Sequence, residues 1–174
     1  MVCRQTRYVY VPFTTGSAAD LWLLLIFLIF MKISSVFKDG QTIPERFTCK
    51  GENVNPRLDF SELPIEAKSL ALIMDDPDAP AGTFVHWVAW NIPVSKEIKE
   101  NANGLGVDGV GSFGVPGYRG PCPPPGNGPH RYFFKAYALD CLLELKPGSD
   151  KEKLLKAMEG HVLASAELMG RFER

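Results

Sequence analysis

The segment Pro121–Tyr132, which reads PCPPPGNGPHRY, constrains the fold more than any other part of the chain. Its first four prolines fix φ and remove backbone donors, and Gly126 and Gly128 can adopt positive φ. The backbone here is therefore a shaped loop, and the run FFKAYAL that follows it is typical of a buried strand. His130, a titratable ring at this junction, is a candidate binding group, because rigid scaffolds often hold binding groups on loops. The alternative is that His130 only hydrogen-bonds its own loop.

A second histidine lies in the predicted strand 83–93, which reads TFVHWVAWNIP. Under strict alternation, His86 shares one side of this strand with Phe84, Val88 and Trp90. A lone histidine in such a strand is usually a core residue that bonds a backbone carbonyl. The other histidine, at the start of the aromatic strand, favours a second interpretation in which two imidazoles from separate strands share one site.

An acidic turn follows the apolar run SLALIM at residues 69–74, which predicts a strand covered on both faces. An Asp-Pro-Asp sequence makes a stiff corner by local chemistry alone. We interpret Asp75 and Asp78 as structural. Asp76 is the functional candidate, because a carboxylate at the end of a buried strand can orient a neighbouring imidazole. The turn lacks the spacing of an EF-hand loop, so no metal site is predicted.

The first half of the chain also predicts short elements. Strands are expected at 33–37 and 46–49, around the turn KDG. Residues 95–103 are polar and predict a brief helix or a loop. Residues 101–130 hold nine glycines and six prolines, so this long segment has irregular structure of the kind often found beside binding sites. Its GLGVDG string is not a dinucleotide motif, because no strand precedes it and no helix can follow it.

The C-terminal part predicts a helix. Ser149 and Glu152 match a capping box, and apolar residues continue at near-helical spacing from Leu154 to Met169. The helix is expected to start near this box and to pack one side on the sheet, with Gly160 dividing or bending it. The closing residues GRFER are compatible with a short final strand.

Charge and cysteine spacing exclude several classes of protein. The formal net charge is −1 and no basic cluster is longer than two residues, so the electrostatic footprint of a nucleic-acid-binding protein is absent. The cysteines have no C-x-x-C spacing, which excludes a zinc site and a dense disulfide framework. A reducing compartment fits them best, with a single bridge left open. The cysteines stand at positions 3, 49, 122 and 141.

The first 31 residues differ in composition from the rest, so we treat 1–31 as an N-terminal extension and 32–174 as the folded domain. Leu21–Met31 is an unbroken apolar run, shorter than the ~20 residues of a spanning helix but within the length of a signal-peptide core. One interpretation is that translation begins at Met31, which predicts a cytoplasmic protein. The alternatives are export or membrane anchoring through this run, and a structured extension.

Convergence of His86, His130 and Asp76 would create a site for a small anion. Imidazoles and a tyrosine hydroxyl offer hydrogen-bond donors, and an approaching anion favours the charged form of a ring. The same residue types fit a small-ester hydrolase, which needs a nucleophile beside a base. Cys122 and Ser112 are the candidates, but neither lies in a known nucleophile signature.

Three motifs occur in order along the chain: DPDAP from Asp76, the dipeptide His86-Trp87, and GNGPHRY from Gly126 to Tyr132. In this order and at these separations they resemble the phosphatidylethanolamine-binding protein (PEBP) family. The likeness is to its bacterial and archaeal branch, often called Raf-kinase-inhibitor-like. It covers the chain from about residue 32 to the C-terminus.

The resemblance implies a mostly β fold, an antiparallel β-sandwich with a C-terminal helical segment packed on the sheets. It also implies a small anion pocket at one end of the sheets, which binds phosphate or a phosphoethanolamine-like headgroup. No catalytic residue, metal or cofactor is implied. The residues expected in the pocket wall are Asp76, His86, Pro124, His130 and Tyr132.

The resemblance further implies a binding protein rather than an enzyme. Family members lack an established enzymatic mechanism, and some act by binding kinases or proteases. A kinase or protease partner is therefore expected, with residues 101–120 as the candidate surface. A homodimer is also expected, because prokaryotic relatives form one. The chain departs from the eukaryotic pattern in its proline-rich insertion before Gly126.

Overall fold

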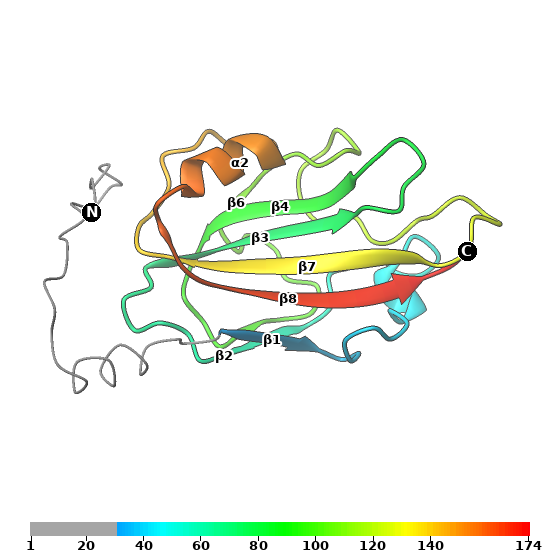
Figure 1. Cartoon of the computed structure of the whole chain (residues 1–174), viewed down its shortest axis with the longest axis horizontal. Coiled ribbons are helices and arrows are strands. Elements are labelled where there is room, and N and C mark those ends of the chain that lie inside the picture. The colour runs from blue at the N-terminus through cyan, green and yellow to red at the C-terminus, as the bar shows by residue number, and fades with distance from the viewer. Residues whose placement is uncertain (1–30) are drawn as a thin grey trace, which may run out of the picture.

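The computed structural model describes residues 31–174, and Figure 1 shows its elements. The extension predicted for 1–31 therefore lies outside the described residues, except for Met31, whose side chain is buried in the core. The strands are β1 (Lys32–Ser35), β2 (Leu58–Ser61), β3 (Ser69–Asp76), β4 (Phe84–Ile92), β5 (Glu97–Ile98), β6 (Val107–Asp108), β7 (His130–Leu139) and β8 (Val162–Phe172). The helices are the short 3-10 helix η1 (Glu45–Phe47) and the α-helix α2 (Lys151–Met158).

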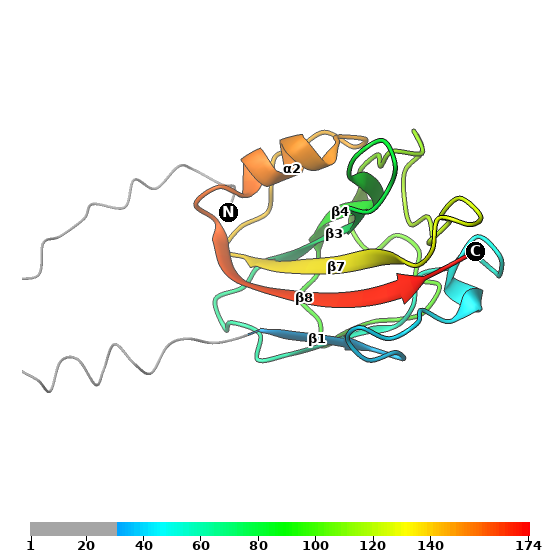
Figure 2. The same ribbon diagram turned by 45° about the vertical axis from the view of Figure 1, so that its right-hand side comes forward.

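The strands form two antiparallel sheets. One has the order β1-β2-β5 and the other the order β6-β4-β3-β7-β8. The larger sheet lies between the smaller sheet and α2 (Figure 2). The main core fills the space between the two sheets, and a second apolar cluster fills the space between the larger sheet and α2. The prediction of a mostly β, sandwich-like fold with a C-terminal helix is confirmed.

The central strand β3 explains the order of the layers. All eight of its residues are buried, as predicted for a strand covered on both faces. Leu72 and Met74 belong to the core between the sheets, whereas Ala71 and Ile73 belong to the cluster under α2. β3 ends at Asp76, so this carboxylate lies at one end of the larger sheet.

The alternation predicted along β4 is wrong at His86. The register against β3 shifts between Met74, which opposes Trp87, and Asp75, which opposes Val85. This β-bulge adds a residue to β4, and a bulge re-aims the side chains beyond it. As a result His86 and Val88 lie on different faces of the sheet. Val88 lies in the cluster under α2, whereas His86 contacts the core between the sheets.

Two other local predictions are wrong, and a third is correct in part. The segment predicted as a strand at 46–49 contains the end of η1 instead, because Pro44 starts a helical turn there. The segment 95–103, predicted as a brief helix or a loop, is a loop apart from the short strand β5. The predicted long helix ends at Met158, and the following residues form β8, which pairs with β7 along nearly its whole length.

The helix cap also differs from the predicted box. The N-cap residue of α2 is Asp150, whose side chain accepts a hydrogen bond from the backbone N–H of Lys153 at 2.9 Å. Ser149 is buried just before it. The start of the helix is therefore one residue later than the box predicts, with the same capping chemistry.

Candidate functional site

Asp76 and His130 form a buried pair at the end of the larger sheet. Asp76 is the last residue of β3 and His130 the first of β7, and these strands are antiparallel neighbours. The His130 Nδ1 lies 2.7 Å from Oδ2 of Asp76, and each side chain is 4% exposed. The other carboxylate oxygen accepts from the backbone N–H of Asp78 at 2.8 Å. The carboxylate is thus held at both oxygens, and it fixes the His130 ring through Nδ1.

His86 is fixed in the same way from β4. Its Nδ1 lies 2.8 Å from the backbone carbonyl oxygen of Arg119. A carbonyl can only accept, so Nδ1 carries the hydrogen and Nε2 holds the lone pair of the neutral ring. Burial lowers the pKa of His86 below its usual 6.5, and the hydrogen bond to Arg119 and the charge of Asp76 oppose that effect only in part. The ring therefore favours its neutral form.

Tyr132 follows His130 by two residues in β7 and lies beside the ring of His86. Its ring is 5.2 Å from the His86 ring in an edge-to-face arrangement, and its side chain is fully buried. The hydroxyl has no well-formed hydrogen bond to any residue among 31–174. Burial, and then the nearby charge of Asp76, raise the pKa of Tyr132 far above its usual range. The hydroxyl is therefore neutral, and the Asp76 carboxylate and the backbone of Cys122 lie near it without forming a hydrogen bond of normal geometry.

Two phenylalanines complete the surroundings of His86. Phe84 and Phe113 lie 5.2 Å and 5.5 Å from its ring, measured between centroids, and 4.8 Å from each other. Phe113 belongs to the loop after β6 and is 42% exposed. It forms the outer wall of the site. The two histidines themselves are each only 3% exposed, so the site is largely closed to solvent.

The other acidic residues of the turn have cationic partners. Asp78 forms a two-pronged ion pair with the Arg131 guanidinium, at 2.6 and 2.8 Å, which lowers the pKa of Asp78 to about 2. Asp75 is buried and pairs with Lys135 and Lys151 on the face towards α2. Both carboxylates hold elements together, in line with the structural role predicted for them.

The proline-rich loop is tied to the loop after η1. A disulfide joins Cys49 to Cys122, and the N–H of Cys49 donates to the carbonyl of Pro121 at 3.0 Å. This bridge differs from the expectation of reduced cysteines, because disulfides are typical of oxidising environments. It also removes Cys122 from the candidate nucleophiles, since a bridged sulfur has no thiolate.

The structure brings together four of the five predicted wall residues. The contacts described above link Asp76, His86, His130 and Tyr132. Pro124 is exposed in a turn, where its own carbonyl accepts a hydrogen bond from the N–H of Asn127. Residue reasoning missed the Arg119 carbonyl that orients His86, because a backbone acceptor has no sequence signal. It also missed Phe113, an aromatic residue in a glycine-rich segment, which could have drawn attention.

Comparisons with known proteins agree on one family. The family profile "Phosphatidylethanolamine-binding protein" matches residues 33–173. A UPF0098 protein of Methanothermobacter thermautotrophicus is 52% identical over 145 residues, covering 79% of this chain and 95% of that protein. A UPF0098 protein of Pyrococcus horikoshii is 50% identical over 152 residues, covering 83% of this chain and 77% of that protein.

Two solved structures are similar in fold. A putative phosphatidylethanolamine-binding protein homologue from Chlamydia trachomatis superposes with a TM-score of 0.80 at 43% identity, covering 84% of this chain and 99% of that one. YbcL of Escherichia coli, described as a member of the mammalian PEBP family, gives a TM-score of 0.76 at 29% identity, covering 83% and 98%. The chain belongs to the phosphatidylethanolamine-binding protein family.

The apolar run Leu21–Met31 lies outside the described residues apart from its last residue. Within residues 31–174, neither helix has the length and apolar character that crossing a bilayer requires.

Proposed function

We propose that this chain is a non-enzymatic binding protein whose site at Asp76, His86, His130 and Tyr132 takes a phosphate or a phosphoethanolamine-like headgroup. The Tyr132 hydroxyl is the observation that carries the proposal. A buried polar group normally has a partner, and leaving one unpaired costs about 1–3 kcal/mol. Here the hydroxyl has no hydrogen bond of normal geometry among residues 31–174 and lies beside the fixed ring of His86, where a phosphate oxygen can accept from it.

The protonation state of the rings suits an anion. Both Nδ1 atoms are used by Asp76 and the Arg119 carbonyl, and no hydrogen bond among residues 31–174 uses either Nε2. A phosphate oxygen at Nε2 of His86 favours the charged ring, so binding takes up a proton there. Asp76 offsets the added charge of the rings. The site therefore matches a small anion better than a cation or an apolar molecule.

Isothermal titration calorimetry with O-phosphoethanolamine and inorganic phosphate tests the proposal. Tyr132→Phe removes only the hydroxyl, and we expect it to weaken binding by roughly 1.5–3 kcal/mol, the range for a hydrogen bond to a charged group. Tyr137→Phe is the matched control, because Tyr137 lies in the same strand but borders the cluster under α2. Equal affinities for the wild type and Tyr132→Phe would contradict the proposed role of the hydroxyl.

A hydrolase of small esters is the competing function. With Cys122 bridged, Ser112 is the remaining nucleophile candidate, and its hydroxyl accepts from the backbone N–H of Val85 at 2.9 Å. That contact leaves the hydroxyl hydrogen free, and Asp150 and Glu152 line the same cavity, but no hydrogen bond among residues 31–174 joins either carboxylate to Ser112. Incubation with an activated ester followed by mass spectrometry separates the two functions. Covalent labelling of Ser112 would overturn the non-enzymatic proposal, and an unlabelled protein that binds phosphate supports it.

We also propose that the loop 101–120 contacts a partner protein such as a kinase or a protease. The support is a pair of exposed apolar side chains, Phe113 at 42% and Val115 at 39%. Deleting the loop would remove glycines packed against β4, so a point change is the better test. Val115→Ser should abolish inhibition in kinase and protease assays while phosphate affinity is unchanged. Inhibition that persists in Val115→Ser would exclude this part of the loop.

A further inference from the structure

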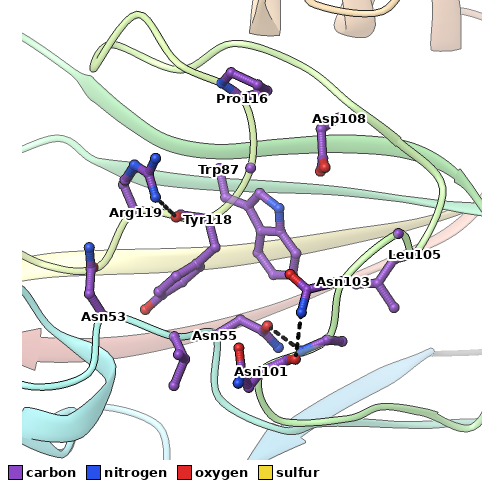
Figure 3. Close-up of a pocket in the computed structure, with 14 residues that line it drawn as sticks. Asn53, Asn55, Trp87, Asn101, Asn103, Leu105, Asp108, Pro116, Tyr118 and Arg119 are labelled. Atoms are coloured by element: carbon purple, nitrogen blue, oxygen red, sulfur yellow. Dashed lines mark hydrogen bonds between the residues drawn. The ribbon is translucent and has the colours of Figure 1, made fainter.

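A cavity with a different character from the histidine site lies on the other side of Arg119 (Figure 3). It has a volume of about 340 Å3, which is in the range of small-molecule sites, roughly 300–1,000 Å3. Its walls come from the segments 53–55, 101–105 and 116–119, together with Trp87 and Asp108. We call it the amide pocket, because four asparagines line it. None of the four residues of the histidine site lines this pocket.

The walls of the amide pocket are held in place before any ligand arrives. Asn55 joins two of them, because its side chain donates to the carbonyl of Lys99 and accepts from the N–H of Ala102, both at 2.9 Å. Asn53 accepts from the N–H of Gly120 at 2.8 Å. A Cβ at Gly120 would lie 2.1 Å from the carbonyl oxygen of Phe47, which shows how closely this wall packs. Such preorganisation lowers the cost of binding.

The groups that face the pocket and are not used by the fold are a mixture of donors and acceptors. The side chain of Asn101 makes no hydrogen bond among residues 31–174, and Asn103 makes only a long one, of 3.4 Å, to the Asn101 carbonyl. The Arg119 guanidinium makes one, of 3.3 Å, to the carbonyl of Tyr118, and it has no carboxylate partner there. An amide both donates and accepts, as does a hydroxyl group.

The charges of the pocket favour a neutral ligand. Arg119 and Asp108 are its two charged lining residues and have opposite sign. Burial raises the pKa of Asp108, against a smaller opposite effect of the indole N–H of Trp87. An anion attracted by Arg119 would be repelled by Asp108. A cation attracted by Asp108 would be repelled by Arg119. Hydroxyl groups can donate to the carboxylate and accept from the guanidinium without adding charge.

Apolar surface lies between these polar groups. Tyr118 stands perpendicular to Trp87 with ring centroids 5.5 Å apart, and Leu105 and Pro116 line the pocket beside them. Figure 3 shows the two aromatic rings side by side, with the asparagines to the left of them and below them. A pyranose has the same combination, because its C–H faces are apolar and its rim carries hydroxyl groups. The electron-rich face of an aromatic ring attracts such C–H groups.

We propose that the amide pocket binds a neutral sugar, a monosaccharide or disaccharide, independently of the anion at the histidine site. The backbone of Arg119 connects the two sites. Its N–H donates to the carbonyl of His86 at 3.1 Å, and its carbonyl accepts from Nδ1 of the same residue. A sugar would contact the Arg119 side chain, whereas His86 contacts the Arg119 backbone, so the two ligands use different parts of this residue.

The test is an NMR titration of the 15N-labelled protein with glucose, galactose, mannose, sucrose and trehalose, up to tens of millimolar. At least one sugar should give saturable shifts of the Trp87 indole N–H and the Asn101 and Asn103 side-chain amides. Asn103→Ala should weaken that response at least threefold, and Asn127→Ala, an exposed asparagine outside the pocket, should not. Both variants should bind phosphate as the wild type does.

Two outcomes overturn the proposal. One is the absence of saturable shifts at these groups with every sugar of the panel. The other is a response to glycine or inorganic phosphate, used as zwitterionic and anionic probes, without a response to sugars. His130→Gln separates the two sites, because it should remove phosphate binding and leave the sugar response intact. A sugar response that disappears in His130→Gln would mean that the pocket is not an independent site.

Discussion

The Nδ1 of His130 lies 2.7 Å from Oδ2 of Asp76, and this pair joins the end of β3 to the start of β7. The proline-rich loop and the acidic turn therefore meet at one point, although 54 positions separate the two residues. The pair is buried on all sides, so it both stabilises the end of the sheet and sets the orientation of one imidazole. The first prediction separates these two roles.

Asp76→Ala should lower the free energy of unfolding by about 3 kcal/mol, measured by urea denaturation. The change leaves two buried donors, the His130 ring and the N–H of Asp78, without an acceptor. Asp76→Asn should cost less, since the amide oxygen can still accept. Asp59→Ala is the control, because its ion pair with Arg57 is exposed and should be worth no more than about 1 kcal/mol. Equal costs for Asp76→Ala and Asp59→Ala would contradict the buried pair.

Loss of the ion pair between Asp78 and Arg131 should contribute to the fall of the unfolding free energy at acidic pH. The folded state holds the pKa of Asp78 at about 2, against 3.8 normally. A lowered pKa stabilises the fold above 3.8, and this contribution disappears as the pH falls from 3.8 through 2. With solvent screening it amounts to about 1 kcal/mol. Arg131→Gln should flatten the fall in unfolding free energy between these pH values, and an unchanged slope would exclude the pair as its source.

His86 should make stability and anion binding respond to pH in opposite directions. Burial lowers its pKa below 6.5, so the unfolded chain takes up the proton first and stability falls as the pH drops below 6.5. Sulfate does not titrate in this range, and by favouring the charged ring it should bind more tightly as the pH falls. Calorimetric titrations with sulfate at a series of pH values check this. A sulfate affinity that is constant from pH 7 to pH 5 would show that His86 takes up no proton on binding.

The disulfide should fix the loop that carries His130. It closes a loop with a sequence separation of 73, for which a stabilisation of about 3–4 kcal/mol is expected. The variant with Cys49→Ser and Cys122→Ser should therefore unfold at lower urea concentration, and its amides at 120–129 should exchange hydrogen faster. Hydrogen bonds such as Cys49 N–H to Pro121 remain, so the loop should loosen rather than detach. Unchanged exchange in this loop would show that those bonds hold it without the bridge.

The strands that were predicted correctly are those whose sequence has one dominant pattern. β3 and β7 are long runs of apolar and aromatic residues between clear turns, and both form as predicted. Only the end of β8, in the closing residues GRFER, was predicted as strand, and the rest was missed because the sequence VLASAELMGRF contains good helix formers and has buried positions mainly near its end. Its pairing with β7 overrides that propensity. The boundary between helix and strand was therefore decided by tertiary contacts.

In the candidate site, too, some features have a local sequence pattern and others depend on tertiary contacts. Asp76, His86 and His130 stand at strand ends or in strands, so their approach could be inferred from a few motifs. The bulge that turns His86 towards Tyr132 depends on the register of β4 against β3, which a single sequence does not encode locally. The bridge between Cys49 and Cys122 depends on a meeting of two loops. Both features follow from packing at long range.

The most direct test of the central claim is the response of the two ring nitrogens to a phosphate ligand. In 15N-histidine-labelled protein, O-phosphoethanolamine should shift the Nε2 resonances of His86 and His130 saturably and raise the pKa of His86. The third histidine, His161, bonds Asp140 away from the site and serves as the internal control. Saturable changes at His86 and His130 with His161 unchanged are the predicted result. Nε2 resonances of both site histidines that do not move at saturating ligand would contradict the account.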